Sequence, residues 1–175
     1  EEFEIMKRDI SLCKELQCDG VVIGLLQKDG SIDKARTARL VDAAYPLGVT
    51  FHRAFDRAAN PFEALEDVIE TGCERILTSG LKPTAPEGAD TIEALVRQAD
   101  DRIIIMPGSG VRADNIASLA QQTRAVQFHS SARKSIASAM EYINVQMNEE
   151  LVSAQLDTDE VAKMLEALSS LDTGK

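Results

Sequence analysis

The feature of the sequence that most constrains its fold is a regular alternation between short apolar segments and amphipathic helical patterns. The spacing between successive apolar segments is about 25 to 30 residues, the length of a strand with its helical crossover. The segments with the pattern of a strand, or of a strand and its exit turn, are 21–26, 49–56, 75–80, 103–106 and 125–129. This alternation predicts an α/β fold with parallel strands and right-handed connections. Five such units suit either an open doubly wound sheet or about five of the eight βα units of a (β/α)8 barrel of TIM type.

Helical patterns fill the intervals between these segments. The clearest start is Asn60-Pro61, because Asn is a good N-cap, proline suits the first helical position and Glu63 lies in the first turn. The expected helices cover 2–16, 33–44, 60–72, 92–96, 112–121 and 157–168. The interval 135–155 has weak periodicity and is expected to be a loop with helical turns. With 175 residues, of which 44% are hydrophobic, we expect a single domain over 1–175.

The overall charge argues against one class of partner. The chain has 29 acidic and 19 basic residues, a formal net charge of -10, so it repels a phosphate backbone and nucleic acid is not an expected partner. A local group of basic residues can still bind a small anion. No apolar run approaches the roughly 18 to 20 residues of a membrane span, and no leader pattern is present. We therefore expect a cytoplasmic protein without membrane contact.

The three cysteines, Cys13, Cys18 and Cys73, include no CxxC pair and suit a reducing compartment. Cys13 and Cys18 are five positions apart, which would place them on different sides of a continuing helix. Cys73 precedes its strand. All three are expected to be small core residues.

The residues directly after the strands are the candidates for chemistry, because the carboxyl ends of parallel strands share one rim. Both histidines of the chain, His52 and His129, fall there and are candidate acid or base groups. Arg53 is a candidate clamp for a phosphate or carboxylate, and an ion pair between Arg53 and Asp56 is an equal expectation. Asp56 is also the one carboxylate obviously placed to orient an imidazole.

Hydroxyl and glycine residues at the same rim predict an anion site. Backbone N–H groups of a glycine-rich βα turn can hold an anion, although tight turns also need glycine for conformational reasons. Phosphate sites in (β/α)8 barrels commonly use the last two loops of the barrel. The candidate anion-binding residues are Thr78, Ser79, Gly80, Gly108, Ser109, Gly110, Ser130 and Ser131.

Four motifs at these strand ends resemble one known family. They are VTFHRAFD (49–56) with Asn60-Pro61, ILTSG (76–80), PGSGVR (107–112) with Asn115, and HSSA (129–132). In this order and spacing they are similar to the CutC family, named for copper homeostasis. The resemblance implies a cytoplasmic (β/α)8 barrel, monomeric or dimeric, with copper binding or copper tolerance. It also implies roughly 70 further residues with three more strands before Glu1. The cysteines proposed as copper ligands in the family lie in that part, so no metal ligand is assigned here.

Three functions remain open on this basis. The first is a copper homeostasis protein with an anion site at the rim, for which His52, His129 and Met106 are the faint local support. The second is a barrel enzyme that acts on a small phosphorylated or carboxylated metabolite by histidine acid-base chemistry. The third is a non-catalytic binding module. The expected partners are a small anion or a copper ion. Self-association is expected as well, because an incomplete barrel leaves open strand edges.

Overall fold

The computed structural model describes residues 1–149 and 151–172. The elements in chain order are α1 (Glu2–Glu15), β1 (Gly20–Ile23), α2 (Lys34–Ala44), β2 (Gly48–Phe51), η1 (Arg53–Arg57), α3 (Pro61–Glu70), β3 (Arg75–Thr78), α4 (Ala89–Ala99), β4 (Ile104–Pro107), α5 (Ile116–Thr123), β5 (Arg133–Ala137), η2 (Val145–Met147), β6 (Val152–Leu156) and α6 (Thr158–Asp172). Strands and helices alternate through α5, so the predicted α/β class is confirmed.

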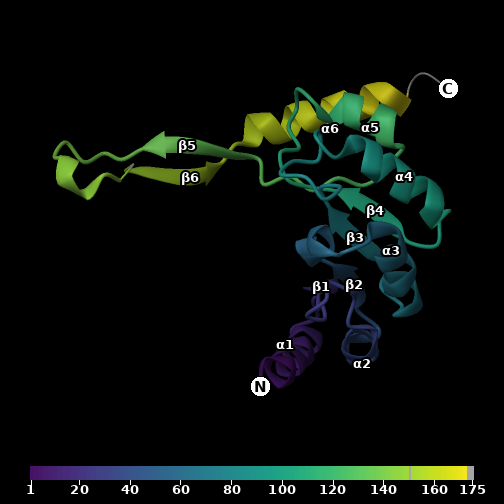
Figure 1. Ribbon diagram of the computed structural model, residues 1–175. Coiled ribbons are helices and arrows are strands. Elements are labelled where there is room, and N and C mark those ends of the chain that lie inside the picture. The colour runs from purple at the N-terminus through teal and green to yellow at the C-terminus, as the bar shows by residue number, and fades with distance from the viewer. Residues whose placement is uncertain (150, 173–175) are drawn as a thin grey trace.

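Strands β1 to β4 form a four-stranded parallel sheet in sequential order. Val21 pairs with Val49, Phe51 with Ile76, and Ile76 with Ile105. Consecutive helices contact one another along the sheet, and α2 to α4 lie on its outer side in Figure 1. Sequential parallel strands with helices outside them are the arrangement of a (β/α)8 barrel, of which this sheet is an arc.

The expected fifth strand, 125–129, is not formed as a strand. His129 makes a single parallel bridge to Gly108, in which its N–H donates to the Pro107 carbonyl at 2.9 Å. Pro107 carries no N–H, so it cannot donate the reciprocal bond of a ladder. The segment nevertheless keeps its place beside β4.

The core lies between the outer face of the sheet and the helices. Phe51 and Ile76 of the sheet, Leu65 of α3 and Leu95 of α4 are completely buried. The inner face carries polar groups, because Arg75 donates to Thr50 Oγ1 and to Gln127 Oε1 at 3.1 and 2.6 Å. Thr50 of β2 and Gln127 therefore lie on this polar inner face, whereas Val126 is 81% exposed and does not join the core.

The start of α3 confirms the prediction from Asn60-Pro61. Asn60 Oδ1 accepts hydrogen bonds from the N–H groups of Phe62 and Glu63, and Pro61 is the first helical residue. This cap fixes where the helix behind β2 begins.

Helix α1 ends earlier than its pattern suggested, at Glu15. Gln17 adopts a left-handed backbone conformation with φ 57°, and the N–H of Cys18 donates to the carbonyl of Cys13 at 3.0 Å. The chain thus folds back at the end of the helix. The expectation that Cys13 and Cys18 lie on different sides was conditional on a helix that continues, and α1 ends before it reaches Cys18. Cys73 is buried, as expected of a core residue, whereas Cys13 and Cys18 are half-buried.

The prediction of a loop with helical turns over 135–155 is also wrong in its main part. β5 and β6 form an antiparallel hairpin, with Ser135 paired to Ala154, that projects from the body as an arm (Figure 1). Both strands are exposed along their whole length, so no burial imposes an alternating pattern that sequence could display. Only η2, near the end of the arm, is helical.

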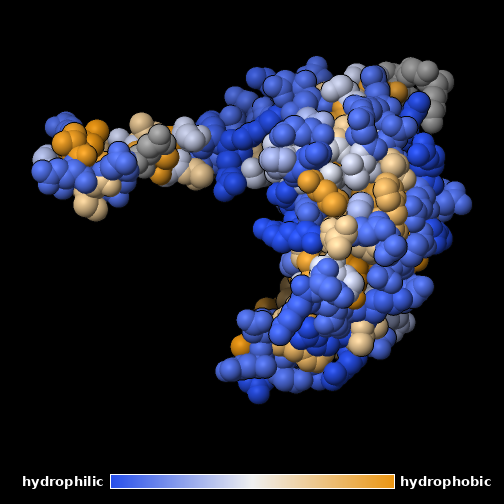
Figure 2. Space-filling model, in the orientation of Figure 1, coloured by the Kyte–Doolittle hydropathy of each residue, from blue (hydrophilic) through white to orange (hydrophobic). Residues whose placement is uncertain are grey.

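The far end of the arm carries apolar side chains, which Figure 2 shows as an orange group away from the body. The exposed apolar side chains of this end are Met140, Tyr142, Ile143, Val145 and Met147. None of the helices within the described residues has both the length and the apolar character that a bilayer crossing requires.

Candidate functional site

His52 lies directly after β2 and caps the short helix η1. Its Nδ1 accepts the N–H of Ala54 at 3.1 Å, and its ring meets that of Phe51 edge to face. A Cβ on Gly24 would lie 2.3 Å from the same Nδ1, so only glycine allows the imidazole this position. Because Nδ1 is an acceptor, a neutral His52 carries its proton on Nε2. The structure therefore gives His52 a local positioning role.

Asp56 organises the rim between β2 and β3. Its side chain is 7% exposed and its carboxylate accepts a hydrogen bond from Arg53 Nε at 2.7 Å, so the expected ion pair is present. The same carboxylate accepts from the N–H groups of Ser79 and Leu81, at 3.0 and 3.2 Å, and from the hydroxyl of Thr78. Asp56 contacts neither imidazole through any hydrogen bond in the described chain.

Two predicted anion ligands, Thr78 and Ser79, bond to this carboxylate, and a third, Gly80, bonds to Thr78. Ser79 and Thr78 are fully buried, and their hydroxyls both bond to Asp56. Ser79 also accepts a hydrogen bond from Arg53 Nη2 at 2.6 Å. Gly80 has φ 68° and donates its N–H to Thr78 Oγ1. Together they hold Arg53 in one orientation.

The remaining predicted residues gather around one cavity, which we name the rim pocket. It has a volume of about 380 Å³ and lies at the carboxyl ends of the strands. The residues that line it are Arg53, Leu77, Ser109, Gly110, Val111, Arg112, His129, Ser130, Ser131 and Arg133. The structure thus brings Arg53 to the two loops from which sequence predicted an anion site, and His52 lies outside the lining.

The lining of the rim pocket is cationic. Three arginines and a histidine face this cavity, and no carboxylate is among its lining residues. Arg53 is anchored through Nε and Nη2, which leaves Nη1 without a partner in the described residues. Arg112 donates through Nη1 to the Arg133 carbonyl at 2.9 Å. Guanidinium groups bind phosphate and carboxylate oxygens in pairs, so this lining suits an anion.

Hydroxyl groups in the rim pocket divide into structural and available ones. Ser109 Oγ donates to the Pro83 carbonyl at 2.8 Å, which joins the loops after β4 and β3. Ser130 Oγ donates to the Val111 carbonyl at 2.7 Å, which joins the loop after 125–129 to the loop after β4. Within residues 1–149 and 151–172, the hydroxyl of Ser131 and the N–H groups of Ser109 and Gly110 make no hydrogen bond. These donors remain for a ligand. Gly108 lies just behind them, against the side chain of His129.

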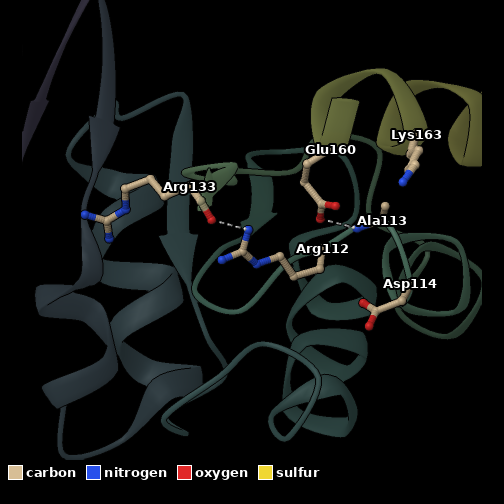
Figure 3. A pocket seen from close by; sticks show the side chains of 6 residues that line it. All are labelled: Arg112, Ala113, Asp114, Arg133, Glu160 and Lys163. Atoms are coloured by element: carbon tan, nitrogen blue, oxygen red, sulfur yellow. Dashed lines mark hydrogen bonds between the residues drawn. The ribbon is translucent and has the colours of Figure 1, made fainter. Parts of the chain in front are cut away.

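A larger cavity adjoins the rim pocket but suits an anion less well. It measures about 650 Å³ and shares Arg112 and Arg133 with the rim pocket. Figure 3 shows the guanidinium of Arg133 pointing away from Glu160 and Lys163. The other charged residues that line the larger cavity are two cations, Arg112 and Lys163, and two anions, Asp114 and Glu160. Glu160 accepts the Ala113 N–H at 2.8 Å. These opposite charges balance, so the smaller cavity is the better candidate.

Sequence reasoning missed two of the three arginines of the rim pocket. Arg112 follows the glycine-rich turn and Arg133 follows the HSSA segment. Their positions beside these two motifs were the signal that could have identified both arginines. Arg133 is the first residue of β5, where it pairs with Leu156, and the pattern did not predict this hairpin.

The rim pocket does not fit copper. Soft Cu(I) selects thiolate and thioether ligands, whereas this lining offers hydroxyls and one imidazole among cationic guanidinium groups that repel a metal ion. Over the described part of the chain, no three His, Cys, Asp or Glu side chains come together as a metal site.

Comparisons with known proteins agree on one family. The model of the CutC family matches residues 1–134. A CutC family protein of Parabacteroides distasonis is 52% identical over 159 residues, which cover 90% of this chain and 65% of that protein. One of Chromobacterium violaceum is 52% identical over 81% of this chain and 57% of its own length. The chain therefore spans about three fifths of the length of these curated relatives.

Solved structures support the fold. A crystal structure from Streptococcus agalactiae, described as a candidate copper homeostasis protein CutC, aligns with a TM-score of 0.69 and 34% identity over 73% of this chain and 63% of that one. The structure described as native KDPGal aligns over 94% of this chain and 65% of that one, with a TM-score of 0.57. At 15% identity, the second likeness concerns the fold alone.

Proposed function

The chain belongs to the CutC family, and from that premise we propose that its rim pocket binds the phosphate or carboxylate group of a small metabolite. One observation carries this proposal. In a chain with a net charge of -10, three arginines line one cavity at the carboxyl ends of the strands and no carboxylate does. Concentrating cations in an acidic protein costs electrostatic free energy unless an anion offsets it.

The details of the pocket favour a tetrahedral oxyanion such as phosphate. Arg53 is held by Asp56 and Ser79 before any ligand arrives, which lowers the entropy lost on binding. The N–H groups of Ser109 and Gly110 and the hydroxyl of Ser131 add donors on the side of the loops. Loops after the last strands of a barrel are a common place for phosphate.

Titration calorimetry with inorganic phosphate tests the proposal, with glucose 6-phosphate as a second ligand. We expect binding that weakens about 10-fold or more in Arg133→Gln and in Arg112→Gln, because each loses a charged hydrogen bond. Arg97→Gln is the matched control, since Arg97 is an exposed arginine of α4 outside the pocket. Equal affinities in all four proteins, or no binding in any, would refute the proposal.

A catalytic role has one supporting observation, the imidazole of His129 in the same pocket. As a general base, this imidazole would move a proton at the carbon next to the carbonyl group of a bound phosphorylated ketose. Incubation with phosphorylated ketoses in deuterated water, followed by proton NMR, tests this. Exchange that is lost in His129→Gln while phosphate still binds supports the enzyme. Phosphate binding without exchange supports a non-catalytic binding module.

A role in copper handling is suggested by the family's name and not by the residues of the rim pocket. The arginines of the rim pocket do not favour a metal ion there, so copper would need another site in this chain. A reducing, cytoplasmic location suits the three free thiols. Self-association is also part of the proposal, because β1 is an edge of the sheet and its Val22 is 62% exposed. Light scattering on the purified chain tests it, and a monomer would contradict it.

A further inference from the structure

The arm formed by β5 and β6 exposes both of its faces and both of its outer edges. Every residue of the two strands is exposed, and in the described residues each of these strands pairs with the other alone. A two-stranded hairpin without a packed face is marginally stable in water. The family match covers residues 1–134, so nearly all of the arm lies outside it. The arm therefore needs a partner surface that its own body does not provide.

The far end of the arm, residues 140–147, is apolar, and we name it the tip (Figure 2). Five large apolar side chains of the tip are at least 58% exposed, namely Met140, Tyr142, Ile143, Val145 and Met147. Together they present on the order of 500 Å² of apolar surface, and a patch of that size on a soluble chain usually marks an interaction site.

A second apolar surface lies at the other end of the arm, where the arm joins the body. It is a groove of about 280 Å³, which we name the base groove. Leu156 lines this groove and pairs with Arg133, the first residue of β5, so the groove lies at the base of the arm. The arm points away from α5 and α6 in Figure 1, so the tip and the groove of one copy do not meet. The apolar lining of the groove includes Ile116, Val126, Phe128, Leu156, Met164 and Leu165.

We propose that two copies of this chain exchange arms, so that the tip of each copy lies in the base groove of the other. Because the tip and the groove are at opposite ends of one arm, a two-fold axis beside the middle of the arm brings each tip onto the other copy's groove. The two arms then run antiparallel, and their outer edges can pair. A different partner would account for the tip but not for a second apolar surface at the base of the same arm.

Charge favours antiparallel arms over arms that run in the same direction. The far end of the arm carries the carboxylates of Glu141 and Glu149, whereas Arg133 and Lys134 lie at its base. Antiparallel arms bring these opposite charges together, and parallel arms would bring like charges together. Two identical contacts, each covering one tip and one groove, bury on the order of 2,000 Å² in total, which lies in the range of stable homodimers.

Sedimentation velocity over a series of concentrations measures the dimer and its Kd. The tip variant, Tyr142→Ser with Val145→Ser, and the groove variant, Leu165→Ser, should each weaken the dimer about 100-fold, because every change acts at both contacts. Leu16→Ser is the matched control, since Leu16 is 68% exposed, against 63% for Leu165, and lies at the end of α1 outside the groove.

This inference rests on the self-association proposed above, and the outcomes separate the two. A monomeric unsubstituted chain contradicts both. A dimer that keeps its Kd in the tip variant or in the groove variant overturns the exchange of arms and leaves self-association standing. Phosphate affinity should be unchanged in the tip variant, because the tip lies outside the rim pocket.

Mixing the tip variant with the groove variant distinguishes exchanged arms from other dimers. The mixed dimer contains one intact contact and places both damaged surfaces in the second contact. Native mass spectrometry should therefore detect more heterodimer than random pairing gives, whereas a dimer that joins tip to tip would give no excess.

Hydrogen exchange on the unsubstituted chain avoids any effect of substitution on folding. The amides of residues 138–149 should exchange more slowly above the Kd of the dimer than below it, because the partner's groove covers the tip. Equal exchange at both concentrations would contradict the proposal.

Discussion

Replacing Asp56 is the most informative perturbation of the rim, because this carboxylate joins two strand exits. It accepts hydrogen bonds from Arg53, from Thr78, from the N–H and hydroxyl of Ser79, and from the N–H of Leu81. In Asp56→Ala all of these donors lose their acceptor at once. We expect a large loss of stability together with a loosened Arg53.

The magnitude follows from which donors can find a new partner. The amides of Ser79 and Leu81 are fixed in place, and each buried N–H without an acceptor costs about 1 to 3 kcal/mol. The single hydrogen of the Ser79 hydroxyl also has the Lys82 carbonyl within reach as an acceptor, so this hydroxyl loses less. Arg53 is 39% exposed and can regain water. The expected cost is about 4 kcal/mol for Asp56→Ala, and about 2 kcal/mol for Asp56→Asn, which keeps one acceptor oxygen.

Equilibrium unfolding in urea, followed by circular dichroism, measures these changes. The control is Asp67→Ala, because Asp67 pairs with Lys34 at 3.0 Å on a more exposed surface and its loss should cost under about 1 kcal/mol. If Asp56→Ala costs no more than the control, the carboxylate does not organise the rim and the reasoning fails. Phosphate affinity should fall in Asp56→Asn, since the Arg53 guanidinium loses its charged partner and is held less firmly.

Three further predictions concern single contacts. Asn60→Ala should cost about 1 kcal/mol in urea unfolding because it removes the cap of α3, whereas Asn60→Asp should cost little; equal effects would argue against the cap. Gly80→Ala should cost about 2 kcal/mol or more, because its φ is 68° and its Cβ would lie 2.3 Å from the Gly88 carbonyl oxygen; a stable variant would contradict this. Hydrogen bonds from Arg102, and then from a glutamine, hold the pKa of Glu66 at about 2, below its ordinary 4.5. The contact therefore stabilises the fold above pH 4.5 and its contribution is lost as the pH falls through about 2, so the stability difference between Glu66→Gln and the unsubstituted chain should shrink over that range.

Local and periodic features were predictable from the sequence. The Asn60-Pro61 start, the four parallel strands and the convergence of strand exits at one rim follow from helix capping, from the two periodicities of side chains and from the geometry of parallel sheets. The same reasoning brought the two last loops together as an anion site, which remains a prediction. Each of these depends on residues close in sequence or on a rule that every parallel sheet obeys.

Other features depend on contacts between distant residues. Thr78 and Ser79 were expected to bind an anion, but they surround the carboxylate of Asp56, more than twenty positions earlier in the chain. Whether a hydroxyl at a strand exit meets a ligand or a neighbouring carboxylate is decided by how the exits pack. Sequence pattern carries no information on that choice.

The sequence by itself therefore determined the class of fold, the order of its elements through α5 and the end of the sheet where polar residues gather. Only the tertiary structure decided that the arm leaves the body, that Cys18 turns back to Cys13, and that Arg53, Arg112 and Arg133 line one cavity. Burial imposes a periodic pattern on the chain, which sequence shows. A backbone turn at Gln17, an exposed hairpin or the direction of a long side chain leaves no such pattern, because no buried face repeats there.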